Sequence, residues 1–252
     1  MDALDREFNK LSNPFTPDFL KHEIEWYGIK EFERDGVCIK TRQMVGRCDD
    51  YLNKNFRTGD VEFPALFVDG RLLMSLTYME IQSSFLPILF ASGECATAGL
   101  GMGYVPLQWA AKDEVDSIDV YEIDERIIKF FIDHFSDRPG FKKMKFIHGD
   151  VRKLMVEKNY DFVFMDPYTN LLDEEIIPDF KLFAGTCCIG DYHFWGQEKV
   201  LLSAILDFDK HIYLNSFEQL YFKMWNETKD SQMYQSLHDE DFIDEVIELM
   251  GR

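Results

Sequence analysis

The stretch Gly93–Glu122, GECATAGLGMGYVPLQWAAKDEVDSIDVYE, decides the fold. A short apolar run leads into Gly99, Gly101 and Gly103, a helical stretch follows, and a second apolar run ends at Glu122. This order predicts a strand, a glycine loop, a helix and a second strand that ends in an acid. Glycines let the backbone turn tightly and let a ligand approach it closely, and the acid can accept hydrogen bonds from both hydroxyls of a ribose. The stretch therefore predicts a site for a small molecule that carries adenosine.

The spacing of the glycines narrows the choice of ligand. The dinucleotide fingerprint is G-x-G-x-x-G, but Tyr104 stands where its third glycine would be, so the spacing here is G-x-G-x-G. A ligand without phosphates is therefore favoured over a dinucleotide. The stretch resembles motif I of class I S-adenosylmethionine-dependent methyltransferases, and this resemblance implies that the glycine loop passes under the methionine part and the ribose of S-adenosylmethionine. The alternative is a glycine-rich turn in an unrelated α/β protein.

From residue 93 onward the chain alternates between strand-like and helix-like segments, which implies a parallel sheet with right-handed crossovers. Asp124 is the expected N-cap of one helix. Strands are predicted at 94–98, 117–122, 144–148, 160–165 and 186–190, and helices at 104–112, 125–135, 197–208 and 239–250. The predicted buried stripe of the helix at 125–135 consists of Ile127, Ile128, Phe131, Ile132 and Phe135.

Two further strand-like runs, 211–217 and 220–225, follow close together. A terminal β-hairpin resembles the methyltransferase sheet, whose last strand is inserted antiparallel. The resemblance implies an α/β fold over residues 86–252, with a seven-stranded, mostly parallel, doubly wound, Rossmann-like sheet. Within residues 1–85, the part from Val37 to Met74 has short alternating runs, and Asp69-Gly70 between two of them is a strong hairpin signal. A small β-rich extension is therefore predicted there, which either closes over the pocket or forms a homodimer.

Ligands of open α/β sheets lie outside the carboxyl ends of the strands, so the residues there are the candidates for function. Glu122 is the expected ribose ligand. Asp150 and Val151 follow the third strand. The resemblance implies that the acid accepts a hydrogen bond from the adenine amino group and that the next backbone amide contacts the ring. Asp150 can also cap the helix that begins near Val151, and the two roles are compatible.

Three residues after the later strands are candidates for catalysis. Asp166 follows the fourth strand and can orient an amine and take its proton. Tyr168 can offer the face of its ring to a cation. His193, predicted near the end of the fifth strand, can serve as a base for an oxygen nucleophile, although a lone histidine is more often structural.

A second resemblance involves the segment before the glycine loop, FVDGRLLMSLTYME at residues 67–80. A hairpin with D-G, a short helix that contains an acid, and then the glycine loop resemble the layout of spermidine synthases over residues 60–195. This resemblance implies that Asp166 is the catalytic acid that accepts the amine proton. The chain departs from the pattern at two places. Leu73 or Met74 stands near the position of the usual glutamine, and Asp166-Pro167 merges two D-P pairs into one.

The overall charge restricts the partners. Lys plus Arg number 27 and Asp plus Glu 46, which gives a formal charge of −19. Nucleic acids and anionic membranes should be repelled, whereas a cationic small molecule should be attracted. No stretch is long and apolar enough for a transmembrane helix, and no metal-ligand cluster stands out. Five cysteines without an N-terminal apolar segment favour a cytoplasmic location over secretion.

The leading hypothesis is therefore an S-adenosylmethionine-dependent methyltransferase for a small-molecule or protein acceptor, with an amine favoured. The first alternative is aminopropyl transfer to a polyamine from decarboxylated S-adenosylmethionine. The second alternative is a non-catalytic protein that binds an adenosyl ligand and fills its acceptor site with aromatic side chains such as Tyr168, Tyr192, Phe194 and Trp195.

Overall fold

The computed structural model describes residues 17–49, 51, 55–57, 60–170 and 173–197. Five parallel strands in the order β11-β10-β7-β8-β9 form the larger sheet. These strands are β7 (Gly93–Ala98), β8 (Val115–Glu122), β9 (Met144–His148), β10 (Asn159–Met165) and β11 (Cys188–Phe194). The predicted runs 211–217 and 220–225 and the helices at 197–208 and 239–250 lie outside the described residues. The predicted parallel α/β sheet is confirmed, and its count of seven strands stays a prediction.

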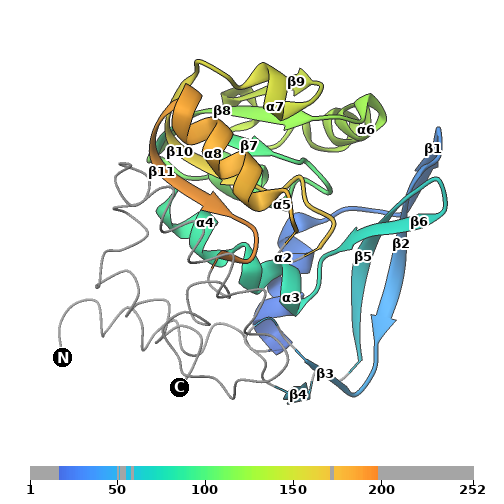
Figure 1. Cartoon of the computed structure of the whole chain (residues 1–252). Coiled ribbons are helices and arrows are strands. Elements are labelled where there is room, and N and C mark those ends of the chain that lie inside the picture. Colours follow the sequence, from blue (N-terminus) through green and yellow to red (C-terminus); the bar gives the residue numbers. More distant parts are fainter. Residues whose placement is uncertain (1–16, 50, 52–54, 58–59, 171–172, 198–252) are drawn as a thin grey trace.

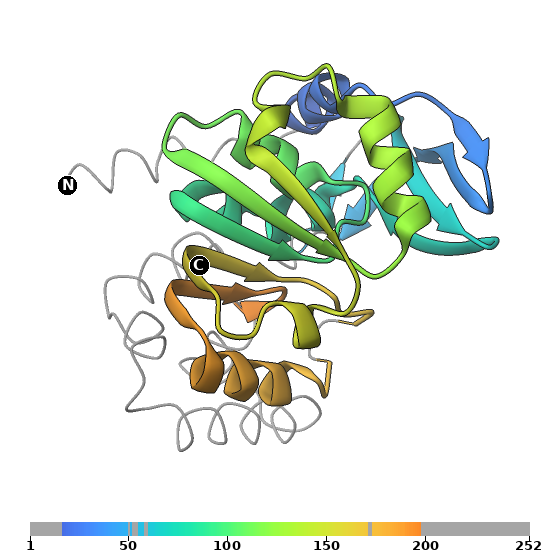
Figure 2. The same ribbon diagram turned by 90° about the horizontal axis from the view of Figure 1, so that it is seen from above.

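Helices cover both faces of this sheet, as the alternating pattern predicts. They are α5 (Tyr104–Ala110), α6 (Glu125–Phe135), α7 (Val151–Leu154) and α8 (Ile176–Thr186), with a 3-10 turn η1 (Phe141–Lys143) before β9. One apolar cluster joins α5 and α6 to one face, and a second joins α7 and α8 to the other. Seen from above, α8 and α6 lie on opposite sides of the strands (Figure 2). The sheet is therefore doubly wound, with β7 at its centre.

The N-terminal part forms a second, antiparallel sheet beside the first (Figure 1). Its order is β1-β2-β5-β6, and β5 and β6 form the hairpin predicted at Asp69-Gly70, where both residues have positive φ. The elements are α2 (Pro17–Tyr27), β1 (Phe32–Arg34), β2 (Val37–Met44), β3 (Arg47–Asp49), β4 (Asn55–Arg57), β5 (Val61–Val68), β6 (Arg71–Ser75), α3 (Tyr78–Ser83) and α4 (Phe85–Phe90).

The extension packs directly onto the larger sheet. Its apolar residues share one core cluster with α5 and α6, and Phe32 of β1 lies 5.4 Å from Phe130 of α6 between ring centroids. The buried stripe of α6 therefore includes Phe130, and Ile132, which was predicted to be buried, is 36% exposed. The stripe prediction was wrong at Ile132, and it missed Phe130, which is buried because α6 contacts β1 as well as the sheet behind it.

The fifth strand also differs from its prediction. It was expected at 186–190, but β11 runs from Cys188 to Phe194 and pairs with β10 along most of this length. His193 therefore lies inside the strand, opposite Phe164, and Trp195 is the first residue beyond the strand end. Helix α8, which connects β10 to β11, was not predicted.

Candidate functional site at the carboxyl edge of the sheet

The glycine loop lies where the ends of three strands meet. Gly99 has φ +87°, and its amide donates to the Tyr121 carbonyl at 2.9 Å. The Asp166 amide donates in turn to the Ala98 carbonyl at 2.9 Å. A Cβ at position 99 would lie 2.2 Å from the carbonyl oxygen of Asp166. Glycine is therefore required here, and its close approach brings the loop after β7 against the first residue after β10.

We expect Gly99→Ala to lower the free energy of unfolding by about 3 kcal/mol or more, because the clash is with backbone that cannot rotate away. The matched control is Gly46→Ala, where φ is +82° but no atom lies within 4 Å of the new Cβ. That change should cost only about 1–2 kcal/mol, the strain of the left-handed conformation alone. Urea denaturation of both variants measures the difference, and equal losses would contradict the packing argument.

Glu122 joins the glycine loop to the start of α6. Its side chain is buried, and its two carboxylate oxygens accept hydrogen bonds at 2.8 Å from the amides of Leu100 and Asp124. Asp124 is the N-cap of α6, as predicted, and accepts from the Arg126 amide. Each carboxylate oxygen still has lone pairs for a further donor. The ribose role of Glu122 stays a prediction, and its position beside the loop is compatible with it.

The amides of the glycine loop donate mostly within the protein. The Met102 amide donates to the thioether sulfur of Met74 at 2.9 Å, and the Gly103 amide donates to the Leu100 carbonyl at 2.7 Å. Anion sites at such loops depend on several amides that point at the ligand. With Gly99 and Leu100 also donating internally, this arrangement favours a ligand that needs close approach rather than a phosphate.

Asp150 and Val151 begin α7 at the end of β9. Asp150 is the N-cap of α7 and accepts from the Arg152 amide at 3.1 Å, so its capping role is confirmed. The guanidinium of Arg152 holds the buried Asp179 of α8 with contacts of 2.6 and 2.8 Å. The Val151 side chain is buried in the core. The adenine role of the pair stays a prediction.

Ile123, which follows Glu122, is a residue that the sequence reasoning missed. It is 70% exposed, directly beside the buried Glu122. A large apolar side chain left open beside a buried polar group offers a face for a flat ring. The signal was present in the sequence as an isoleucine directly after a strand-end acid.

Asp166 and Glu80 form a carboxyl pair. Glu80, on α3, was not among the predicted site residues. Burial raises the pKa of Glu80 from 4.5 to about 7, against the opposing effect of the Ser84 hydroxyl. Burial also raises the pKa of Asp166 well above its ordinary range, and the charge of Glu80 raises it further. Two carboxyls that disfavour each other's charge hold a proton readily and would be relieved by a cation.

The raised pKa of Glu80 predicts a pH dependence of stability. The unfolded chain loses the Glu80 proton near pH 4.5 and the folded chain near pH 7, so stability falls as pH rises through this window. Glu80→Gln should remove part of this fall, on the order of 2 kcal/mol. The free energy of unfolding of the variant, relative to that of the wild type, should therefore be higher at about pH 8 than at about pH 5. Urea unfolding at both values measures it, with the exposed Glu94→Gln as control. An unchanged pH dependence in Glu80→Gln would contradict the account.

Tyr168 lies in the segment that follows β10. Its ring packs with the cluster under α8, and burial together with the neighbouring Tyr192 and Asp179 raises its pKa above the ordinary range. The hydroxyl is therefore neutral and close to the Arg152–Asp179 pair. This placement links the segment after β10 to α7, and the cation role of Tyr168 stays a prediction.

His193 lies below the edge of the sheet. Its ring is buried and packs at 4.9 Å from Phe162 and at 6.1 Å from Phe90 between centroids. Burial lowers its pKa to about 3, so the imidazole is neutral near pH 7. The predicted role as a base is not tested by this position, but the surroundings are those of a core histidine.

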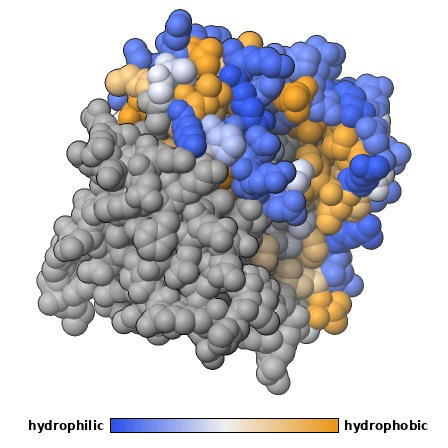
Figure 3. Space-filling model, viewed as in Figure 1, coloured by the Kyte–Doolittle hydropathy of each residue, from blue (hydrophilic) through white to orange (hydrophobic). Residues whose placement is uncertain are grey.

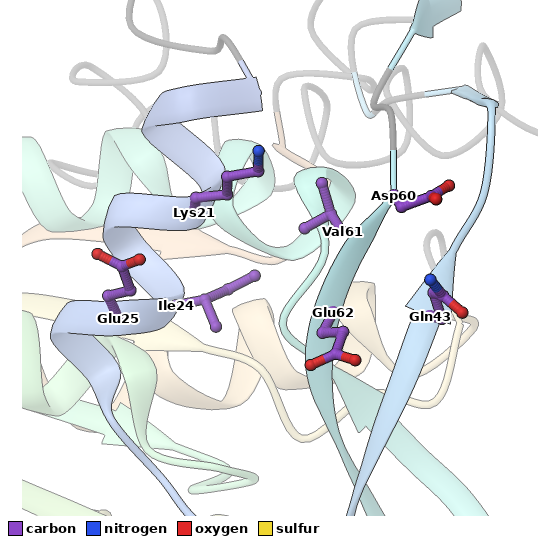
Figure 4. A pocket seen from close by; sticks show the side chains of 7 residues that line it. All are labelled: Lys21, Ile24, Glu25, Gln43, Asp60, Val61 and Glu62. Atoms are coloured by element: carbon purple, nitrogen blue, oxygen red, sulfur yellow. The ribbon is translucent and has the colours of Figure 1, made fainter.

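An open groove lies elsewhere, between α2 and the strands β2 and β5 (Figure 4). It has a volume of about 440 Å³, and none of the predicted site residues lines it. Its lining residues are Lys21, Ile24, Glu25, Gln43, Asp60, Val61 and Glu62. Among the described residues no helix could span a membrane, and no group of three or more His, Cys, Asp or Glu side chains is arranged to hold a metal ion.

The strand order and the place of the glycine loop decide the architecture. With β7 central, β8 and β9 lie on one side and β10 and β11 on the other. The described strands of the larger sheet therefore have a Rossmann-like, doubly wound arrangement. No known protein-family profile matches it, and no curated protein matches it.

Solved structures show partial likenesses. The S-adenosylhomocysteine-bound methyltransferase PaMTH1 from Podospora anserina has 15% identity and a TM-score of 0.39, over 61% of this chain and 70% of that one. Spermidine synthase from Thermotoga maritima has 13% identity and a TM-score of 0.39, over 64% of this chain and 52% of that one. Precorrin 8w decarboxylase from Methanobacterium thermoautotrophicum has 14% identity and a TM-score of 0.35, over 44% of this chain and 58% of that one. The chain thus covers less than two thirds of the length of the latter two proteins.

Proposed function

We propose that this chain is a transferase that moves a carbon group from an adenosyl sulfonium donor to an amine, with S-adenosylmethionine as donor and methyl as the group. The observation that supports the proposal is the convergence of three features at one edge of the sheet. These are the glycine loop, the buried Glu122 that touches it, and Asp166, whose carbonyl oxygen would lie 2.2 Å from a Cβ at Gly99.

On the donor side, Glu122 would accept hydrogen bonds from the ribose hydroxyls and Ile123 would lie against the adenine ring. Asp150 would accept from the adenine amino group. The loop at Gly99–Gly103 would let the sulfur end of the donor approach the backbone. This chain therefore supplies alignment, which is the main requirement of an in-line displacement.

On the acceptor side, Asp166 and Glu80 would hold the amine. The pair binds a proton in the free protein, and a cationic amine would replace it. Asp166 then takes the proton of the reacting nitrogen. The nitrogen lone pair forms a bond to the donor carbon, the carbon–sulfur bond breaks, and its electron pair stays on sulfur as a neutral thioether. The sulfonium charge passes to the alkylated nitrogen, so the product leaves as an ammonium ion and the proton taken earlier stays on the carboxyl.

Aminopropyl transfer from decarboxylated S-adenosylmethionine is the second candidate. The observation that favours it is the second carboxyl, Glu80, because a diamine carries two positive charges and the site has two carboxyls that can ionise when cations displace their protons. The formal charge of −19 would draw such a substrate towards the protein and would repel nucleic acids and anionic membranes.

The test is an activity screen on the full chain. Each donor is incubated with monoamines, diamines and polyamines, and with alcohols of matched length as controls. Mass spectrometry then distinguishes addition of a methyl group from addition of an aminopropyl group. We expect product with amines and none with the alcohols. If a donor binds and no acceptor of either kind reacts, the chain is a non-catalytic binding protein and the proposal is wrong.

A further inference from the structure

Met74 of β6 covers the middle of the glycine loop. Its sulfur accepts the Met102 amide at 2.9 Å and lies 2.3 Å from the point where a Cβ would stand on Gly101. Gly101 has φ +50°, a conformation that Asn or Asp also adopts, so the backbone alone does not require glycine. What requires glycine is the thioether that fills the space beside it.

Met74 is half-buried and packs against the apolar core as well as on the glycine loop. Its neighbours Leu72 and Leu73 are 59% and 48% exposed, and apolar side chains show over β5 and β6 on the right of Figure 3. The Met102 carbonyl accepts a hydrogen bond from the Tyr27 hydroxyl of α2. The amide and the carbonyl of Met102 are thus both hydrogen-bonded to side chains of the N-terminal part, and one of these side chains is the flexible thioether of Met74.

The second glycine of a G-x-G loop serves the close approach of a ligand to the backbone. In this chain that approach is already occupied, and a ligand cannot contact the same face of Gly101 while the Met74 sulfur lies on it. Methionine is unbranched and has three rotatable bonds, so its side chain can leave at low cost. The contact it would lose, a hydrogen bond to sulfur, is a weak one.

We propose that the Met74 side chain occupies the donor site in the free protein, and that it must rotate away from Gly101 before the adenosyl donor can bind. The inference rests on the proposed function, because it takes the ligand of the loop to be an adenosyl compound. The apparent affinity for the donor is then the intrinsic affinity multiplied by the fraction of molecules in which the Met74 side chain has left Gly101. The hairpin β5–β6 acts on the donor site through this one side chain.

The first test is calorimetric titration of S-adenosylhomocysteine into the wild type, Met74→Ala and Met79→Ala. Met79 is the matched control, since it is 40% exposed on the neighbouring α3. Met74→Ala should bind at least about fivefold more tightly, which corresponds to an occupant that stands aside in about one fifth of the wild-type molecules. Met79→Ala should bind like the wild type. Equal or weaker binding by Met74→Ala would overturn the inference.

The second test uses the wild type and so does not depend on how the variant folds. The rates of sulfoxide formation by hydrogen peroxide at Met74 and Met79 are compared by peptide mass spectrometry, with and without saturating S-adenosylhomocysteine. A displaced Met74 should oxidise faster with ligand, while Met79 keeps its rate. A Met74 that stays in place as a wall of the site would be protected instead, which contradicts the inference. If the ligand binds none of the proteins, the proposed function itself has failed.

Discussion

Glu122→Gln is expected to reduce the affinity for S-adenosylhomocysteine by about 100-fold or more. The carboxylate accepts the amides of Leu100 and Asp124, one on each oxygen, and in the proposed complex it also accepts the ribose hydroxyls. An amide side chain can accept on one oxygen only. The NH₂ group of the glutamine would face the backbone N–H of Leu100 or of Asp124, so that N–H would lose its acceptor. The ribose would also lose an acceptor.

The same substitution should destabilise the fold, because a buried backbone donor is left without a partner. We expect a loss of about 1–3 kcal/mol in the free energy of unfolding. Titration calorimetry and urea denaturation measure the two effects. The control is Glu125→Gln, which removes an exposed carboxylate three residues away whose ion pair is with Lys129. Unchanged ligand affinity in Glu122→Gln, with the fold intact, would remove Glu122 from the donor site.

Asp166→Asn should lower kcat by about 10²–10⁴-fold, the usual contribution of a positioned general base. Donor affinity should be kept, since the contact of residue 166 with Gly99 is made by backbone and survives the change. The asparagine cannot take the proton of the amine, and it removes one charge that would hold a cation. Steady-state rates and donor titration separate these effects.

The matched control lies at the other end of the same strand. Asp161 of β10 accepts the Glu94 amide at 2.8 Å, at the amino edge of the sheet. Asp161→Asn should leave kcat close to that of the wild type. A confirmed activity that survives Asp166→Asn would show that the proton goes elsewhere, and the role given to Asp166 would be wrong.

The elements with a strong local signal could be predicted from the sequence. The hairpin at Asp69-Gly70, the capped helix α6 and the strands β7 to β9 have turn residues, a cap or apolar periods that act within a few residues. The placement of Gly99, Glu122 and Asp166 at one edge followed from them, because parallel strands end together. These predictions concern where residues lie, and their roles still require experiment.

What could not be predicted depends on contacts between distant segments. Phe130 is buried because β1 packs on α6, which the helical period alone does not reveal. Glu80 raises the pKa of Asp166 because α3 brings the two carboxyls near each other from distant parts of the chain. Met74 lies on Gly101 only because the hairpin meets the loop. The polar residues Asp191 and His193 suggest an early end of the fifth strand, whereas its pairing with β10 continues through both.

The most direct test of the central claim is calorimetric titration of the wild type with S-adenosylmethionine and, separately, with its decarboxylated form. We predict that both bind at the glycine loop and that the carboxylated donor binds more tightly. A preference for the decarboxylated donor would favour aminopropyl transfer over methyl transfer at the same site. If neither compound binds, the glycine loop and Glu122 do not form an adenosyl site, and the proposed function is contradicted.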